Sequence, residues 1–175
     1  MLRRMKERRQ LRHQADGLYV ALVAQARNPV FYAEMAVPDS FDGRFELVVL
    51  HVYALTRGLD GRGEAMAELS RMVMESMIDD MDRTLREIGV GDMSVGRKVK
   101  QMAAAFYGRA SAYDRALAGN AEDLRASMIR NVYAGEGPGE EVVDRLAEYL
   151  RRALGAVVQS SDEDAIAGRI AFPLP

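Results

Sequence analysis

"FDGRFELVVLHVYALTR", residues 41–57, is the stretch of sequence that decides the fold. At 100° per residue, its polar sector consists of Glu46 and Arg57, and apolar side chains occupy most of the remaining circumference. A helix that is apolar nearly all round must be covered on most sides, so this segment predicts a central helix. His51 lies in the middle of the segment, and a lone histidine there is typical of a core residue with satisfied hydrogen bonds rather than a metal or haem ligand.

Other segments of the chain also have helical periodicity. Apolar residues recur three and four positions apart over residues 11–26, 64–88, 95–117, 124–133 and 142–157. No stretch alternates convincingly over five residues, which argues against a sheet. We therefore expect an all-α fold, a single-domain bundle of about six helices with short connections. Within this domain, spanning 1–175, we expect a basic segment over 1–13 and an irregular tail over 161–175.

Turn residues set the expected helix ends. Asn28 and the following proline end the first helix, because proline cannot continue it. Asp39 or Ser40 is available to cap the central helix, and Asp92 or Ser94 can cap the helix after the "GVGDMS" turn.

Composition excludes several classes of protein. The chain has 175 residues and no cysteine, so it cannot form disulfides or thiolate metal sites. Its net charge of −2 gives no overall attraction to DNA. Its longest strongly apolar run, residues 47–55, is far shorter than the roughly 20 residues that cross a bilayer. The basic N-terminus has no apolar core behind it, so we expect no secretory signal. We expect a cytoplasmic location, with peripheral attachment to the inner face of the cell membrane left open.

The opening "MLRRMKERRQLRH", residues 1–13, is locally basic. Six of its first twelve residues are Lys or Arg. This pattern fits a solvated helix end, and it also fits contact with an anionic membrane surface or with ribosomal RNA. The sequence does not choose between these interpretations.

The segment "IDDMDRTLREIGVGDMSVGRKVK", residues 78–100, raises the question of a metal site. Prenyl-diphosphate chemistry uses acids at the first, second and fifth positions of such a string, and here the fifth position is Arg83. A second acidic motif on a facing helix is also missing, so we expect no metal and no catalytic residue. Instead, Asp79 with Arg83 and Asp82 with Arg86 are expected to pair along the helix.

Asp80 and Glu87 lie on a different side of that helix from the other acids, toward its neighbours. Carboxylates near a core need donors. We expect both acids to meet cations of other helices in an inter-helix network, with Lys98, Arg109 and Arg44 as candidates.

Methionine is concentrated in the segment over 64–88, which contains Met66, Met72, Met74, Met77 and Met81. Most follow the buried stripe and are expected to fill the core, whereas Met72 falls on the polar side. Because methionine adapts to varied apolar partners, an exposed patch of several hundred Å² that includes Met72 and Tyr107 is the alternative. Gly108, inside a helix at a cost of about 1 kcal/mol, predicts close approach of a neighbouring or bound backbone.

Two longer stretches carry a family resemblance. "FYAEMAVPDSFDGRFELVVLHVYAL" and "DDMDRTLREIGVGDMSVGRKVKQMAAAFYGRASAYDRAL" resemble the ubiquinol–cytochrome c chaperone family in its bacterial, alphaproteobacterial-type form, from about residue 31 to residue 117. The matching positions are Asp39, Gly43, Arg44, Phe45, His51, Asp80, Asp82, Arg86, Glu87, Gly91, Asp92, Phe106, Tyr107, Gly108, Arg109 and Tyr113.

The resemblance implies a non-catalytic assembly chaperone for the respiratory cytochrome bc1 complex, without a cofactor. Its client would be newly made cytochrome b, and mitochondrial relatives also work with a small partner protein at the ribosome. The matching positions are then candidates for partner binding. Two other classes remain open: an all-α metal-dependent enzyme acting on an isoprenoid or similar apolar molecule, and a helical module that binds nucleic acid through its basic N-terminus.

Overall fold

The computed structural model describes the backbone of residues 2–175 and the side chains of residues 5–175. This part of the chain forms eight helices and no strand, which confirms the all-α expectation. The helices are α1 (Leu2–Ala26), α2 (Pro29–Ala33), α3 (Phe41–Leu59), α4 (Glu64–Glu87), α5 (Asp92–Ala118), α6 (Ala121–Asn131), α7 (Glu140–Gln159) and α8 (Asp162–Ile166). Six of them correspond to the predicted segments, of which those over 64–88 and 124–133 run one and two residues past the ends of α4 and α6. The two short helices, α2 and α8, were not expected.

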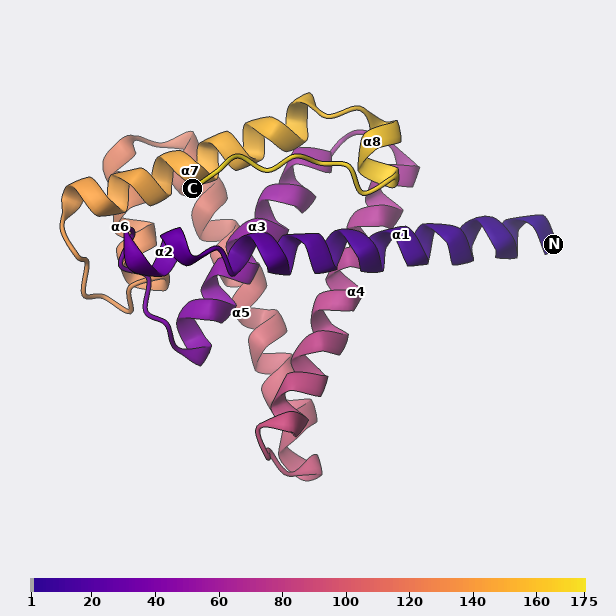
Figure 1. The fold of residues 1–175 in the computed structure, drawn as a ribbon, viewed down its shortest axis with the longest axis horizontal. Coiled ribbons are helices and arrows are strands. Elements are labelled where there is room, and N and C mark those ends of the chain that lie inside the picture. The colour runs from indigo at the N-terminus through magenta and orange to yellow at the C-terminus, as the bar shows by residue number, and fades with distance from the viewer. Residues whose placement is uncertain (1) are drawn as a thin grey trace.

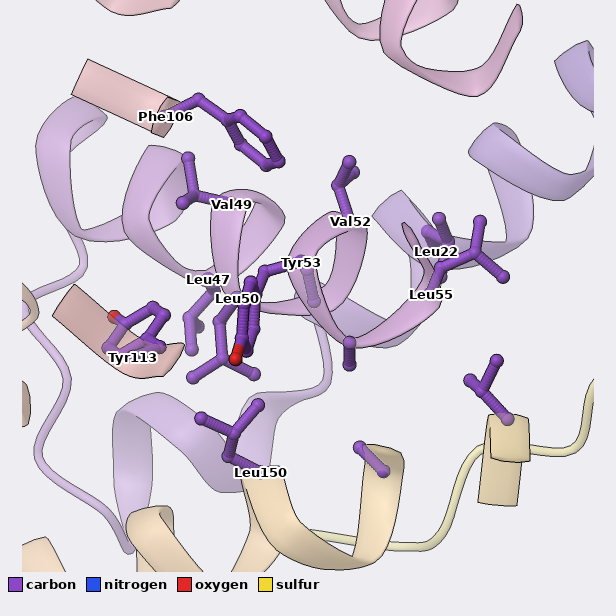
Figure 2. Close-up of a cluster of buried hydrophobic side chains, with 14 of the residues drawn as sticks. Leu22, Leu47, Val49, Leu50, Val52, Tyr53, Leu55, Phe106, Tyr113 and Leu150 are labelled. Atoms are coloured by element: carbon purple, nitrogen blue, oxygen red, sulfur yellow. The ribbon is translucent and has the colours of Figure 1, made fainter. Parts of the chain in front are cut away.

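Helix α3 is the centre of the bundle, as predicted. Residues 49–55 are buried without interruption, so no face of the helix is left to solvent over two turns. Helices α1, α4, α5 and α7 all contact it. Figure 2 shows its side chains meeting Leu22 of α1, Phe106 and Tyr113 of α5, and Leu150 of α7.

The start of α3 is fixed by its own sequence. The hydroxyl of Ser40 accepts a hydrogen bond from the backbone N–H of Gly43 at 3.1 Å, so Ser40, one of the two predicted residues, is the N-cap. A Cβ on Gly43 would lie 1.9 Å from the carbonyl oxygen of Pro38, so only glycine fits beneath the preceding loop. At α5 the prediction of a side-chain cap is wrong: Gly91 is the N-cap, and Asp92 is the first helical residue.

Both ends of the chain contain helix beyond the segments with clear periodicity. The basic segment belongs to α1, which begins at Leu2 and so agrees with the interpretation of a solvated helix end; Met1 and the side chains of residues 1–4 lie outside the described part. In the tail, residues 162–166 form α8, and the final residues run back beside α7 (Figure 1). Gln25 and Arg152 donate hydrogen bonds to the carbonyl oxygens of Pro173 and Leu174 at 2.8 and 3.1 Å.

Helices α4 and α5 form an antiparallel hairpin whose turn lies apart from α1 and α7 (Figure 1). Gly89, with φ of +87°, reverses the chain after α4. Near the turn, Leu85 and Val95 are buried, although neither belongs to the main hydrophobic core. The end of the hairpin is therefore packed locally.

Two glycines in helices provide a matched test of packing. A Cβ on Gly58 of α3 would lie 2.6 Å from Cγ1 of Val157 on α7, and this β-branched side chain is fully buried. Gly58→Ala is therefore expected to lower the free energy of unfolding by about 1–3 kcal/mol. At Gly108 of α5, nothing lies within 4 Å of the added atom, so Gly108→Ala should raise it by up to about 1 kcal/mol. Urea unfolding of both variants measures the difference, and equal effects would contradict the close α3–α7 contact.

Candidate functional site

The first group of predicted site residues surrounds the start of α3. Asp39 and Arg44 form an exposed ion pair, with Nε of Arg44 2.7 Å from Oδ1 of Asp39. The hydrogen bond from Arg44 lowers the pKa of the Asp39 carboxyl. Phe45 is half-buried beside this pair. Arg44 thus pairs with Asp39 at the start of its own helix and not with Asp80.

The strongest polar contact on α3 was missed by sequence reasoning. Glu46, expected in a polar sector, is only 4% exposed, and Nε of Arg109 on α5 donates to both its carboxylate oxygens at 2.7 and 2.8 Å. Burial raises the pKa of Glu46, and the hydrogen bond from Arg109 opposes that rise. The only sequence signal was a carboxylate on an otherwise apolar helix, which did not identify the partner.

The acidic string of α4 does not form one cluster. Asp79 accepts a hydrogen bond from Arg12 of α1 at 3.1 Å rather than pairing with Arg83. Asp80 accepts a hydrogen bond from the Tyr19 hydroxyl of α1 at 2.8 Å. Asp82 pairs with Arg86 as predicted, with oxygen and nitrogen 2.6 Å apart. The three acids therefore have separate partners, and within residues 2–175 no three His, Asp or Glu side chains are placed to share a metal ion.

The predicted network of Asp80 and Glu87 with other helices is wrong in its partners. Asp80 interacts with Tyr19 and, at 3.7 Å, with Arg83 of its own helix. Glu87 is exposed, and so is Lys98. Arg109, the third candidate, forms an ion pair with Glu46.

The turn between α4 and α5 is braced by Arg86. Its guanidinium donates to Asp82 and also to Asp92, the first residue of α5. The hydrogen bond from Arg86 lowers the pKa of Asp82. Asp82, Arg86 and Asp92 thus act together on the shape of the hairpin.

His51 is a core residue, as predicted. Its side chain is fully buried; Nδ1 lies 2.7 Å from the carbonyl oxygen of Leu47, and Nε2 lies 2.7 Å from the Tyr149 hydroxyl. Because a carbonyl can only accept, Nδ1 carries the proton, and the Tyr149 hydroxyl donates to Nε2. Gln25 in turn donates to the Tyr149 oxygen at 3.0 Å. Burial lowers the pKa of His51 to about 4, so the imidazole is neutral.

The remaining predicted residues on α5 divide between core and surface. Phe106 and Tyr113 are buried, and the Tyr113 hydroxyl has no hydrogen-bond partner in the described part of the chain. Tyr107 is 66% exposed. Gly108 has open space around it, so the expected close approach of a neighbouring helix is wrong; approach of a bound chain is still a prediction.

The two residues expected in an exposed apolar patch, Met72 and Tyr107, do not lie on one surface. Met72 is 2% exposed, so its placement on a polar face is wrong, while Met66, Met77 and Met81 are core residues as predicted. Tyr107 instead lines a hollow of about 380 Å³ together with Met74, which is half-buried. Helix α4 packs against α1 as well as α3 and α5, which covers the side that the sequence placed in solvent.

A larger apolar groove lies between the start of α3 and the α4–α5 hairpin. It consists of two hollows of about 720 and 360 Å³. Phe41, Phe45, Ile88 and Met102 line both hollows, so these residues define the apolar groove. Phe41 is 42% exposed and Ile88 is 60% exposed. Sequence reasoning identified only Phe45 of these four.

Cations surround the apolar groove. Arg27 and Arg44 line the smaller hollow, and Lys98, Arg109 and Arg130 line the larger one. Arg44 and Arg109 are neutralised by Asp39 and Glu46. Among the described residues, Arg27, Lys98 and Arg130 have no carboxylate within 4 Å, so the rim carries unpaired positive charge.

The basic segment of α1 is partly used within the fold. Arg12 pairs with Glu75 and Asp79 of α4, and Arg8 lies 3.8 Å from Glu68. Lys6 and Arg9 are exposed. Contact of this segment with a membrane or with RNA is still a prediction. Within residues 2–175, no helix has the length and apolar character of a membrane span.

The chain is thus an all-α bundle whose surface acids form ion pairs with arginines and whose surface carries a large apolar groove. The chain belongs to the ubiquinol–cytochrome c chaperone family, whose sequence model matches residues 33–172. The match includes the helix α3, the α4–α5 hairpin and the helix α7.

Relatives and a solved structure agree with this assignment. Over 149 residues, or 85% of this chain, it is 21% identical to ubiquinol–cytochrome c reductase complex assembly factor 1 of Xenopus laevis and of Homo sapiens. The matches cover 74% of the frog protein and 50% of the human protein, so the chain spans about half the length of the latter. The crystal structure of the Cbp3 homolog from Brucella abortus has a TM-score of 0.86 and 31% identity, covering 99% of this chain and 97% of that chain.

The Glu46–Arg109 pair predicts a strongly non-additive pair of substitutions. Arg109→Met should lower the free energy of unfolding by about 3–5 kcal/mol, because it leaves a buried carboxylate without its counter-charge. Adding Glu46→Met should restore most of that loss, because two apolar side chains then meet. Arg44→Met, at the exposed pair with Asp39, should cost far less, because solvent screens that pair. Urea unfolding tests the set, and equal costs for Arg44 and Arg109 would contradict the structural role of the pair.

His51 predicts a specific dependence of stability on pH. Its pKa falls from 6.5 to about 4 on folding, so below 6.5 the unfolded chain binds a proton that the folded chain refuses. The His51 contribution should be fully present above the unfolded pKa and decline by about 3 kcal/mol as pH falls toward the folded pKa. Unfolding of the wild type and of His51→Gln at several pH values isolates this slope. Parallel pH profiles for the two proteins would show that His51 is not buried neutral.

Proposed function

We propose that this chain is an assembly chaperone for the respiratory cytochrome bc1 complex and that it holds newly made cytochrome b in the apolar groove. The observation that carries the proposal is a groove with partly exposed Phe41 and Ile88 in a member of this chaperone family. An unassembled membrane protein presents apolar segments that need shielding from water.

The chemistry of the groove suits such a client. Its walls combine rigid aromatic rings, Phe41 and Phe45, with the adaptable thioethers of Met81 and Met102. Methionine allows one surface to accept side chains of different shape. The unpaired cations Lys98 and Arg130 on the rim favour a segment with acidic flanks or the C-terminal end of a helix.

The proposal assigns roles to the predicted partner-binding residues. Phe45, Arg44 and Arg109 line the groove and are placed to contact the client, together with Phe41 and Met102. Seven of the other predicted positions act on the shape of the bundle, since they are buried or paired within it: His51, Asp80, Asp82, Arg86, Asp92, Phe106 and Tyr113.

Deletion of the gene tests the chaperone function directly. We expect the amounts of cytochrome b and of assembled bc1 complex to fall, because unshielded cytochrome b would be degraded before assembly. Quantitative immunoblotting and the haem b spectrum of the membranes measure both. Normal amounts of cytochrome b and bc1 complex in the deletion strain would overturn the proposed function.

Substitutions in the groove test its role as the client site. In the deletion strain, Phe41→Ser with Ile88→Ser should fail to restore cytochrome b, although both residues are partly exposed and the fold should persist. Val20→Ser is the matched control, because Val20 is 66% exposed on α1 and lines none of the hollows described above. Full restoration by the groove variant would place the client elsewhere while leaving the chaperone function standing.

A further inference from the structure

The end of the α4–α5 hairpin carries a second surface, distinct from the apolar groove. Met93, in the first turn of α5, is 99% exposed and lines neither hollow of the groove. The hairpin turn lies apart from α1 and α7, at one extremity of the molecule (Figure 1). An apolar side chain at such a position is available to a flat partner without any rearrangement of the bundle.

Cations follow Met93 along one face of α5. Arg97 and Lys100 lie four and seven positions after Met93, so the three residues share one face of the helix. Val95 and Met102 point to the opposite side, where Val95 is fully buried and Met102 packs on the core. The face made by Met93, Arg97 and Lys100 therefore points away from α4, and we call it the tip face.

The tip face is electrostatically unpaired. Arg97 and Lys100 are exposed, and in the described part of the chain neither has a carboxylate within 4 Å. The nearby acid Asp92 is engaged by Arg86. Residues 83–100 contain five Lys or Arg against two acids, whereas the whole chain has a net charge of −2. Positive charge is thus concentrated on the hairpin, although the chain as a whole has a net negative charge.

We propose that the tip face binds the surface of a bilayer containing anionic lipids, with Met93 entering the acyl boundary and Arg97 and Lys100 meeting lipid phosphates. At about 1.5 Å of rise per residue, the two cations lie about 6 and 10 Å behind Met93 along the helix. Apolar groups of interfacial helices enter about 5–10 Å into the headgroup boundary. With the hairpin end-on, the cations are therefore at headgroup level when Met93 reaches the acyl chains.

The geometry favours a membrane over a protein partner at this point. A stable protein interface buries a continuous area with an apolar core, whereas the tip offers one projecting apolar side chain backed by long basic ones. Long cationic side chains reach phosphates while their methylene stems remain in apolar surroundings. Each Lys or Arg near an anionic surface contributes about fivefold in binding, and salt screens this contribution.

A single tryptophan tests insertion directly, because the chain contains none. In Met93→Trp, vesicles of equal parts phosphatidylcholine and phosphatidylglycerol should shift the emission to the blue, and vesicles of phosphatidylcholine alone should shift it far less. Val20→Trp on α1 is the matched control and should show no shift. An unchanged emission of Met93→Trp with anionic vesicles, or an equal shift in the control, overturns the proposal.

Co-sedimentation with the same vesicles tests the cations. Arg97→Gln with Lys100→Gln should weaken binding on the order of 25-fold, while Arg115→Gln with Arg151→Gln, at exposed cations away from the tip face and the apolar groove, should change it little. Loss of binding only with Lys6→Gln and Arg9→Gln would assign the membrane contact to α1 and overturn the proposal.

One further outcome separates a protein contact from a lipid contact. If Met93→Ser leaves vesicle binding intact but lowers cytochrome b in cells, the tip serves a protein, and the proposal fails. Circular dichroism of each variant checks that the helices are intact. None of these vesicle measurements depends on the chaperone function, so either proposal can fail alone.

Discussion

The constraint on which the rest of the structure depends is the burial of residues 49–55 of α3 on all sides. A helix without a solvent face cannot be stable unless other helices cover it, and α1, α4, α5 and α7 all contact it. The helices of the bundle are therefore arranged around α3 and do not form a ring of equivalent helices. Most residues from Leu47 to Leu59 are buried in these contacts.

Two polar groups on α3 make this packing specific. Glu46 is satisfied by Arg109 from α5, and His51 is satisfied by Tyr149 from α7. Apolar contacts tolerate sliding, whereas a buried carboxylate or imidazole loses its partner if the register changes. These two contacts therefore fix how α5 and α7 are placed relative to the centre. The C-terminal residues add to this arrangement, since Phe172 packs against the His51 ring with centroids 5.8 Å apart.

The same arrangement leaves apolar side chains uncovered at one place. The α4–α5 hairpin contacts the body of the bundle along part of its length and then extends beyond it (Figure 1). Phe41 at the start of α3 and Ile88 at the end of α4 consequently face a groove instead of another helix. The proposed client site thus lies where the hairpin extends beyond the body of the bundle.

Local sequence patterns were sufficient for much of the fold. The periodicity of α3 to α7, the Ser40 cap, the core role of His51 and the pairing of Asp82 with Arg86 could all be predicted, because each depends on residues within a few positions of one another. Helix α8 could not, since its five residues are too few to show a period. Of the four residues that define the groove, only Phe45 was among the positions that the resemblance named.

The wrong predictions about side-chain burial and pairing share a physical cause. Met72 is buried and Glu46 is paired because other helices cover faces that a single-helix projection assigns to solvent. Asp80 has Tyr19 as its partner, 61 residues earlier, and no spacing rule connects the two. Periodicity along one chain segment determines which side of a helix is apolar. The packing of all the helices decides which helix lies against that side. It also decides which polar groups meet across the contact, and neither can be read from one segment alone.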